Sequence, residues 1–155
     1  MHKKQIYLAA PFFNPTQLAT VEMVENLIEK CGIACYSPRK DGVLKAMTAE
    51  ERKAAAPKIF KLNCSNIVHS DGFLALLDEH DTGTYWECGF AYYNQRYVTA
   101  RYKTFAFTSG SKVLNVMLRQ GFQHYAQSIE ELEVMLTLWR DNKAIAGNAA
   151  SADVY

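Results

Sequence analysis

The chain alternates between short apolar runs and longer segments in which apolar residues recur at helical spacing. Each short run ends at polar residues, Gly or Pro, which is typical of a strand followed by a turn. The pattern predicts strands at Gln5–Ala9, Ile33–Tyr36, Gly72–Leu77 and Lys103–Thr108. The third is apolar throughout, as expected of a central parallel strand that is buried on both faces.

Helices are predicted in the segments between these strands. They run over Thr16–Cys31, from Thr48 to about Ile67, from Thr84 onward, and from Ser128 through an apolar face that includes Trp139. The second and the last open at capping boxes, in which a Ser or Thr is followed three residues later by Glu. Pro57 lies inside the second helix and is expected to break or kink it.

Strands that alternate with helices predict a parallel sheet, because a parallel connection needs a helix to return the chain. We therefore expect a single α/β domain over residues 1–143. Its fold would be flavodoxin-like: a doubly wound, five-stranded parallel sheet in the order 2-1-3-4-5, with helices on both faces. Residues 144–155 form a small, Ala-rich tail that is a candidate for disorder. Ligands of such sheets bind at the carboxyl ends of the strands.

Composition narrows the class of protein. At 155 residues and 49% hydrophobic content, the chain can bury a core without disulfides or metal. A formal charge of +1 gives no reason to expect nucleic acid or an anionic membrane as partner. No apolar run approaches a membrane span, and the N-terminus lacks the apolar core of a signal peptide. The four cysteines form no CxxC pair and are interpreted as reduced thiols, so we expect a cytoplasmic protein.

Carboxylates flank the central apolar strand. Asp71 precedes it, and Asp81 and Glu87 follow it across a turn and the start of a helix. With no metal motif nearby, several carboxylates at one cleft suggest nucleophilic and acid–base chemistry, as in retaining glycosyl transfer, with no cofactor. Each of these carboxylates can also have a purely structural role. Glu87 can favour the helix dipole, Asp81 can be a turn residue, and Asp71 can cap the preceding helix.

Other residues are expected near the same crevice. Phe12 and Phe13, which follow the first strand, can hold a flat ring or simply pack against the core. Tyr7 would ordinarily be a core residue, and Asn115 can cap a helix. The pattern alone therefore predicts a cleft with acids and leaves its function open.

Several segments carry a resemblance to a known family. They are Ile6–Asn14 (IYLAAPFFN), Ser37–Arg39 (SPR), Asp71, Asp81–Gly89 (DTGTYWECG) and Leu114–Met117 (LNVM), in that order, with a C-terminal Val-Tyr. Together they resemble the nucleoside 2-deoxyribosyltransferase family over nearly the whole chain. The resemblance implies a pentosyltransferase of nucleotide salvage that needs no cofactor. Its substrates would be 2′-deoxynucleosides and free purine or pyrimidine bases.

The resemblance also implies catalytic roles. Glu87 matches the nucleophile, which would attack C1′ of the sugar and form a covalent deoxyribosyl-enzyme. A second base then attacks from the vacated face, so the configuration at C1′ is retained. Tyr7 matches the tyrosine that orients the nucleophilic carboxylate, and Asp71 the acid that exchanges a proton with the base. Asp81 matches a residue that binds the sugar hydroxyls.

The remaining substrate-binding positions follow in the same way. Phe12, Phe13 and Gly83 are expected to lie at the substrate. Asn115 resembles the family asparagine that reaches the 5′ side of the sugar from a neighbouring subunit, and Tyr155 is similar to family tails that complete the site. The resemblance thus implies a homo-oligomer, a dimer or hexamer, with active sites shared between subunits.

Two departures from the family pattern leave alternatives open. Asn63-Cys64 stands where many members have Asn-Asp, so any contact of that aspartate is lost. The segment Asn94–Lys103, with Arg96 and Arg101, is longer than in close relatives. If it folded inward, these arginines could hold the phosphate of a deoxynucleoside 5′-monophosphate N-glycosidase. A remoter alternative is a non-catalytic flavodoxin-like nucleotide-binding module, although its phosphate loop would follow strand one.

Overall fold

The computed structural model describes residues 3–41 and 48–146. Five strands form one sheet in the order β2-β1-β3-β4-β5, and every neighbouring pair is parallel. The strands are β1 (Gln5–Ala9), β2 (Ala34–Tyr36), β3 (Gly72–Leu76), β4 (Lys103–Phe107) and β5 (His124–Ala126). The predicted flavodoxin-like fold and its strand order are confirmed.

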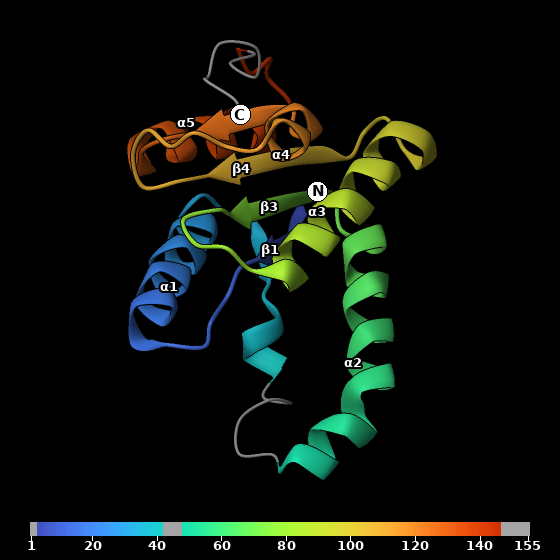
Figure 1. The fold of residues 1–155 in the computed structure, drawn as a ribbon. Helices are drawn as coiled ribbons and strands as arrows, with labels where there is room; N and C mark the ends of the chain where they lie inside the picture. The colour runs from blue at the N-terminus through green and yellow to red at the C-terminus, as the bar shows by residue number, and fades with distance from the viewer. Residues whose placement is uncertain (1–2, 42–47, 147–155) are drawn as a thin grey trace.

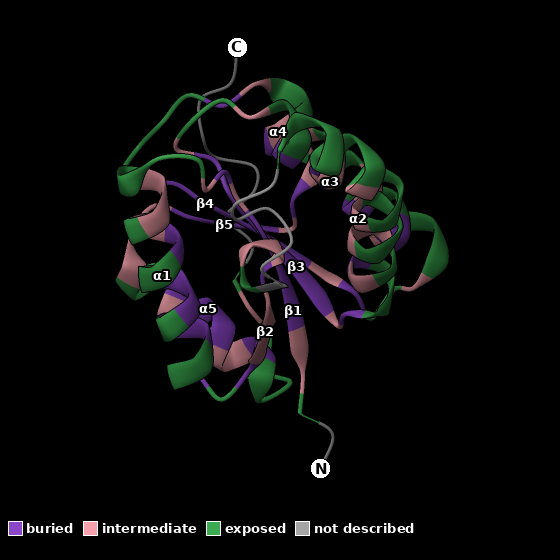
Figure 2. Cartoon of the chain, turned by 90° about the horizontal axis from the view of Figure 1, so that it is seen from below, coloured by how far each residue is buried: buried purple, intermediate pink, exposed green. Residues whose placement is uncertain are grey.

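Helices cover both faces of this sheet (Figures 1 and 2). They are α1 (Pro15–Lys30), α2 (Ala49–His69), α3 (Thr82–Tyr93), α4 (Val116–Gly121) and α5 (Ile129–Arg140), with a 3₁₀ turn η1 (Pro38–Asp41) and a π-helical turn η2 (Asn94–Val98). Figure 2 shows α1 and α5 on one side of the buried strands and α2, α3 and α4 on the other. The sheet is therefore the middle layer of three.

The two core clusters follow from the alternation of side chains along the strands. In β1, Ile6 and Leu8 pack in the cluster shared with α1 and α5. Tyr7 and Ala9 point to the opposite face and pack in the cluster shared with α2 and α3. All five residues of β3 are buried, as its uninterrupted apolar sequence predicted. This alternation is what places Tyr7 beneath α3.

The structure decides between two outcomes left open for Pro57 and adds one strand that the sequence analysis did not locate. Pro57 was expected to break or kink the second helix; α2 continues to His69 as one helix, and Figure 1 shows its N-terminal part turned at an angle to the rest, so the helix bends without breaking. The position of the fifth strand, His124–Ala126, was not identified from the sequence. It has only three residues, and it becomes a strand because it pairs with β4. No helix within residues 3–41 and 48–146 has the length and apolar character needed to cross a membrane.

Candidate active site

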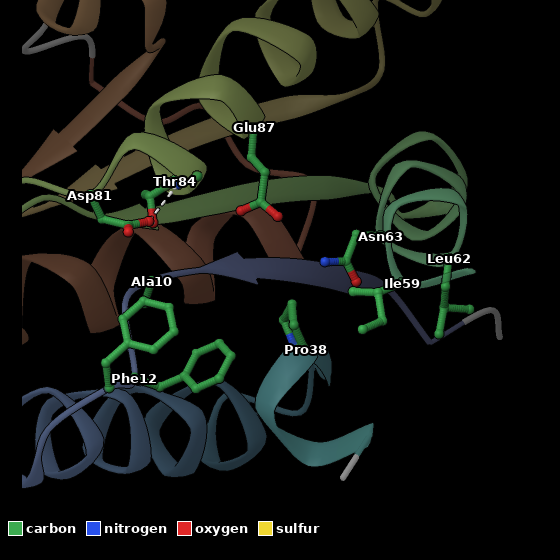
Figure 3. A pocket seen from close by; sticks show the side chains of 11 residues that line it. Ala10, Phe12, Pro38, Ile59, Leu62, Asn63, Asp81, Thr84 and Glu87 are labelled. Carbon is green, nitrogen blue, oxygen red and sulfur yellow. Dashed lines mark hydrogen bonds between the residues drawn. The ribbon is translucent and has the colours of Figure 1, made fainter. Parts of the chain in front are cut away.

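A cavity of about 170 Å³ opens at the carboxyl ends of β1 and β3 (Figure 3). Four segments contribute its walls: the loop after β1, the start of η1, the middle of α2 and the first turns of α3. The lining residues are Ala10, Phe12, Phe13, Pro38, Ile59, Leu62, Asn63, Asp81, Gly83, Thr84 and Glu87. The predicted crevice therefore exists, and most of its wall is apolar.

Glu87 lies at the centre of this cavity and is held by Tyr7. The Tyr7 hydroxyl donates a hydrogen bond of 2.6 Å to Glu87 Oε1. Burial raises the pKa of Glu87 to about 7; the Tyr7 hydrogen bond opposes this rise, and the nearby Asp81 charge adds to it. Near neutral pH a large fraction of Glu87 is therefore ionised, and the carboxylate is more basic than an exposed glutamate.

Tyr7 is a rigid support for this carboxylate. Its side chain is completely buried, and its ring stacks on Tyr36 at 5.4 Å and on Phe73 at 5.8 Å between centroids. Burial, together with the Glu87 charge, raises the pKa of the Tyr7 hydroxyl. The hydroxyl therefore stays protonated and acts as a donor, while the stacked rings fix its direction.

Asp81 caps the start of α3 and also lines the cavity. Asp81 Oδ2 accepts hydrogen bonds from the Thr84 backbone N–H at 2.7 Å and from Thr84 Oγ1 at 2.8 Å. Among the residues that the structure describes, none donates to Oδ1, so this oxygen can accept from a bound molecule. Gly83 leaves room for the cap, because a Cβ there would lie 3.3 Å from Asp81 Oδ2.

The aromatic pair after β1 forms the opposite wall. The rings of Phe12 and Phe13 are stacked at 5.1 Å, and Phe13 is 71% exposed. Both residues line the cavity together with Pro38, and Figure 3 shows Phe12 across from Asp81 and Glu87. A flat, apolar ring can be held against this wall.

Asp71 does not join these residues, and the expectation that it would converge on the crevice is wrong. It precedes β3, and its Oδ2 accepts a hydrogen bond of 2.8 Å from the backbone N–H of Gln5, at the start of β1. It lines a separate hollow together with Lys4 and Lys103. The length of β3, roughly 17 Å at 3.3 Å per residue, separates it from the cavity. Asp71 is at the amino end of the sheet because it comes before the strand.

One further expected site residue, Asn115, is not in the cavity wall formed by the described residues. Asn115 caps α4 by accepting a hydrogen bond of 2.9 Å from the Met117 backbone N–H, and it does not line the cavity of its own chain. Tyr155 lies outside the described residues. Arg101 lines the hollow at the amino end of the sheet, and Arg96 is exposed on η2. Neither arginine lines the cavity beside Glu87.

The sequence interpretation missed the contribution of α2. Ile59, Leu62 and Asn63 form one wall of the cavity because α2 packs against α3. The neighbouring Cys64 thiol has a raised pKa, caused by burial and by the Glu87 charge, so it lies close enough to Glu87 to feel its charge. The departure from the family pattern at Asn63-Cys64 was the signal that could have located this wall.

Comparison with known proteins identifies a family and two solved structures to which this chain is similar. A family model described as nucleoside 2-deoxyribosyltransferase matches residues 6–132. The chain is 26% identical to a solved 2-deoxyribosyltransferase from the psychrotolerant bacterium Bacillus psychrosaccharolyticus; the match covers 83% of this chain and 90% of that one, with a TM-score of 0.70. A conserved protein from Enterococcus faecalis V583 shares the fold at 20% identity, with 87% and 98% coverage and a TM-score of 0.56. No curated protein matches the chain.

Proposed function

Because the chain belongs to the nucleoside 2-deoxyribosyltransferase family, we propose that it exchanges the bases of 2′-deoxynucleosides through a covalent intermediate on Glu87. The observation that carries this proposal is the Tyr7–Glu87 hydrogen bond inside an apolar cavity. A buried carboxylate held in one orientation is suited to attack a sugar carbon, since positioning is a large part of such catalysis.

In the first half-reaction, ionised Glu87 attacks C1′ of the deoxynucleoside. A C1′–O bond to Glu87 forms while the C1′–N bond breaks, and the electron pair leaves with the base. The missing 2′-hydroxyl favours this step, because no electron-withdrawing group opposes the positive charge that develops at C1′. Asp81 Oδ1 accepts from a sugar hydroxyl, while Phe12 and Phe13 flank the flat ring.

The departing base takes up a proton. Asp81 is held by Thr84, and Asp71 lies at the other end of the sheet, so neither is assigned to this step. We assign the proton to water at the open side of the cavity. In the second half-reaction a new base attacks C1′ from the vacated face; the C1′–O bond breaks, Glu87 leaves as a carboxylate, and the N–H proton of the base passes to water. Two inversions give retention at C1′.

The cavity supports a nucleoside rather than a nucleotide as substrate. Within the described part of the chain its lining contains two carboxylates, Asp81 and Glu87, and no Lys or Arg. A phosphate group would be repelled by the carboxylates and would lack the cationic partners that usually bind it. This observation argues against the monophosphate N-glycosidase, in which Arg96 and Arg101 would have to reach the cavity.

We also propose that the protein is a homo-oligomer. An aromatic stripe runs along α2, α3 and η2 and consists of Phe60, Trp86, Phe90, Tyr93 and Tyr97. Ring centroids are 5.2 Å apart for Phe60–Trp86, 5.4 Å for Trp86–Phe90 and 5.3 Å for Tyr93–Tyr97. Four of the five side chains are at least half exposed. Exposed aromatic side chains gathered on neighbouring elements are typical of a protein–protein contact. Asn115 and Tyr155 would then act in a neighbouring site.

The exchange reaction itself is the test. Purified protein is mixed with thymidine and free adenine, and deoxyadenosine is measured by chromatography. We expect deoxyadenosine to accumulate and Glu87→Ala to abolish it. Glu79→Ala is the matched control, because Glu79 is an exposed carboxylate at the same end of the sheet, bonded to Gln17, outside this cavity. Its activity should equal that of the wild type.

Two outcomes would refute the proposal. Cleavage of deoxynucleoside 5′-monophosphates without base exchange would identify the N-glycosidase instead. Full exchange activity in Glu87→Ala would show that the nucleophile is another residue.

A further inference from the structure

A second hollow, of about 810 Å³, lies at the amino end of the sheet. Residues at or just before the starts of β1, β3, β4 and β5 contribute to its walls, together with residues at the end of α5 and after it. Small-molecule sites usually measure about 300–1,000 Å³, so the hollow has the size of such a site. The proposed function gives it no role.

The hollow differs in charge from the cavity beside Glu87. Its charged side chains are four cations and one carboxylate: Lys4, Arg101, Lys103, Lys143 and Asp71. The described lining beside Glu87 contains two carboxylates and neither Lys nor Arg. Because the whole chain carries a formal charge of only +1, the hollow is a local concentration of positive charge. A concave surface of one sign raises the local concentration of ions of the opposite sign.

Lys4 and Asp71 contribute to the fold. The Lys4 ammonium donates to the Trp139 carbonyl and, at 2.7 Å, to Asn142 Oδ1, so it ties the start of β1 to the carboxyl end of α5. Burial lowers the pKa of Lys4, and the negative charge of Asp71 opposes this change. The charges of these two side chains therefore largely offset each other.

The other three cations are not used in this way. Within residues 3–41 and 48–146, the side chains of Arg101, Lys103 and Lys143 make no hydrogen bond or ion pair. Lys103 is half-buried as the first residue of β4, Arg101 is exposed in the turn before it, and Lys143 follows α5. Two segments that are distant in sequence thus bring unpaired positive charges to one hollow.

A buried histidine lines the same hollow. His124 begins β5 and is 9% exposed, and its ring centroid lies 5.2 Å from that of Phe105. Its Nδ1 is buried and has no hydrogen-bond partner in the part of the chain that the structure describes. Burial and the Lys103 charge lower the pKa of His124 to about 4, so the ring is neutral near pH 7. A neutral imidazole still carries one N–H that can donate to an anion.

We propose that this hollow binds the phosphate chain of a small anion. Three unpaired cations suit a ligand with several negative charges, whereas a single carboxylate would leave most of them unneutralised. The Arg101 guanidinium can hold two phosphate oxygens at once, and the ammonium groups of Lys103 and Lys143 bind phosphate as point charges. His124 adds a neutral donor. The site is independent of the proposed function, because none of its residues lines the cavity beside Glu87.

Isothermal titration calorimetry at low ionic strength tests this binding with two probes. Tripolyphosphate is the phosphate chain alone, and thymidine 5′-triphosphate adds a nucleoside to it. We expect tripolyphosphate to bind at one site per chain. Equal affinities for the two probes would show that the site recognises only the phosphate chain, and tighter binding of thymidine 5′-triphosphate would show that it also contacts the nucleoside.

Arg101→Gln and Lys103→Met should each weaken the binding of tripolyphosphate about tenfold, which is the effect of losing one hydrogen bond between charged groups. The matched control is Arg96→Gln, which removes the same charge from an exposed arginine on η2, outside the lining of the hollow. Its affinity should stay within about twofold of the wild type. Unfolding midpoints confirm that each variant is folded.

The ¹⁵N signals of the imidazole rings locate the bound anion. Tripolyphosphate should shift the signals of His124 in the wild type, whereas those of His69 and His80, which do not line the hollow, should stay in place. In Arg101→Gln the same shift of His124 should require about tenfold more tripolyphosphate.

Three outcomes would overturn the assignment. The first is the absence of saturable binding. The second is equal weakening by Arg96→Gln and Arg101→Gln, which would show only a general attraction to positive charge. The third is displacement of tripolyphosphate by saturating thymidine, because the anion would then occupy the cavity beside Glu87. Base exchange can fail without changing any of these measurements, so the anion site and the proposed function are tested separately.

Discussion

Tyr7→Phe removes one oxygen atom from the centre of the site and leaves its surroundings in place. The hydroxyl donates to Glu87 Oε1 at 2.6 Å, and the ring remains stacked between Tyr36 and Phe73. The donated hydrogen bond lowers the pKa of Glu87, while burial raises it to about 7. Loss of the hydroxyl therefore raises this pKa further and reduces the ionised, nucleophilic fraction at neutral pH.

The magnitude follows from the strength of this hydrogen bond. A hydrogen bond to a charged group contributes about 1.5–3 kcal/mol, and one pH unit of pKa corresponds to about 1.4 kcal/mol. The pKa of Glu87 should therefore rise by about one to two pH units in the variant. At pH 7 the ionised fraction would fall from about one half to between about one tenth and one hundredth. We expect the exchange rate at pH 7 to fall about 5- to 50-fold.

The assay is the pH dependence of kcat for base exchange between pH 6 and 10. The acid limb of the profile should move to higher pH in Tyr7→Phe, and the loss should shrink to less than about twofold near pH 9.5. Tyr102→Phe is the control, because it removes another buried hydroxyl, which donates to the Ile67 carbonyl at 2.8 Å. Its profile should match the wild type. A loss of activity in Tyr7→Phe that is equal at every pH would refute this account of the Glu87 pKa.

Three further predictions concern stability and assembly. Burial raises the folded-state pKa of Glu87 to about 7, above that of an unfolded glutamate, so the wild type loses stability as the pH rises from about 4.5 to about 7. Urea unfolding measures the free energy of unfolding of Glu87→Gln minus that of the wild type, and this difference should grow by up to about 3 kcal/mol from pH 4 to pH 8. A difference that is the same at both pH values would contradict this. Gly72→Ala should lower the free energy of unfolding by about 1–3 kcal/mol, because its new Cβ would lie 2.9 Å from Trp139 Cζ2. Gly89→Ala is the control, since no atom lies within 4 Å of the Cβ added there. Equal unfolding midpoints for the two variants would show that Trp139 moves away from the added methyl group without loss of stability. Tyr93→Asp places a charge in the aromatic stripe and should shift an oligomer to monomers in sedimentation velocity; an unchanged sedimentation coefficient would exclude this surface as the contact.

Much of the fold could be predicted because it depends on local periodicity. The spacing of apolar residues in α1 and the uninterrupted apolar run of β3 indicated a helix and a central strand before any contact was known. The strand β5 could not be found in this way. Its three residues carry no alternation that distinguishes a strand, and their conformation depends on pairing with Phe105–Phe107 of β4. Pro57 could be recognised as unfavourable inside α2, but its effect depended on the surrounding helix.

The site was predicted in part. Tyr7 and Glu87 were assigned as a pair through the family resemblance, and the structure brings these residues, 80 positions apart, into contact. Their catalytic roles remain proposals. Asp71 was grouped with Asp81 because both flank β3, although they lie at opposite ends of that strand. The direction of a parallel strand alone places Asp71 at the amino end, away from the ligand crevice.

The sequence by itself determined the class of fold, the family and the identity of the central carboxylate, because periodicity and ordered motifs are properties of the linear chain. Only the tertiary structure decided which groups share one cavity. It separated Asp71 from Glu87 and turned one face of α2 toward the site, which brought Asn63 into the wall. It also determined the basicity of Glu87, since the raised pKa comes from burial among side chains that are distant in sequence. Such effects depend on packing in three dimensions, which no spacing of residues along the chain specifies.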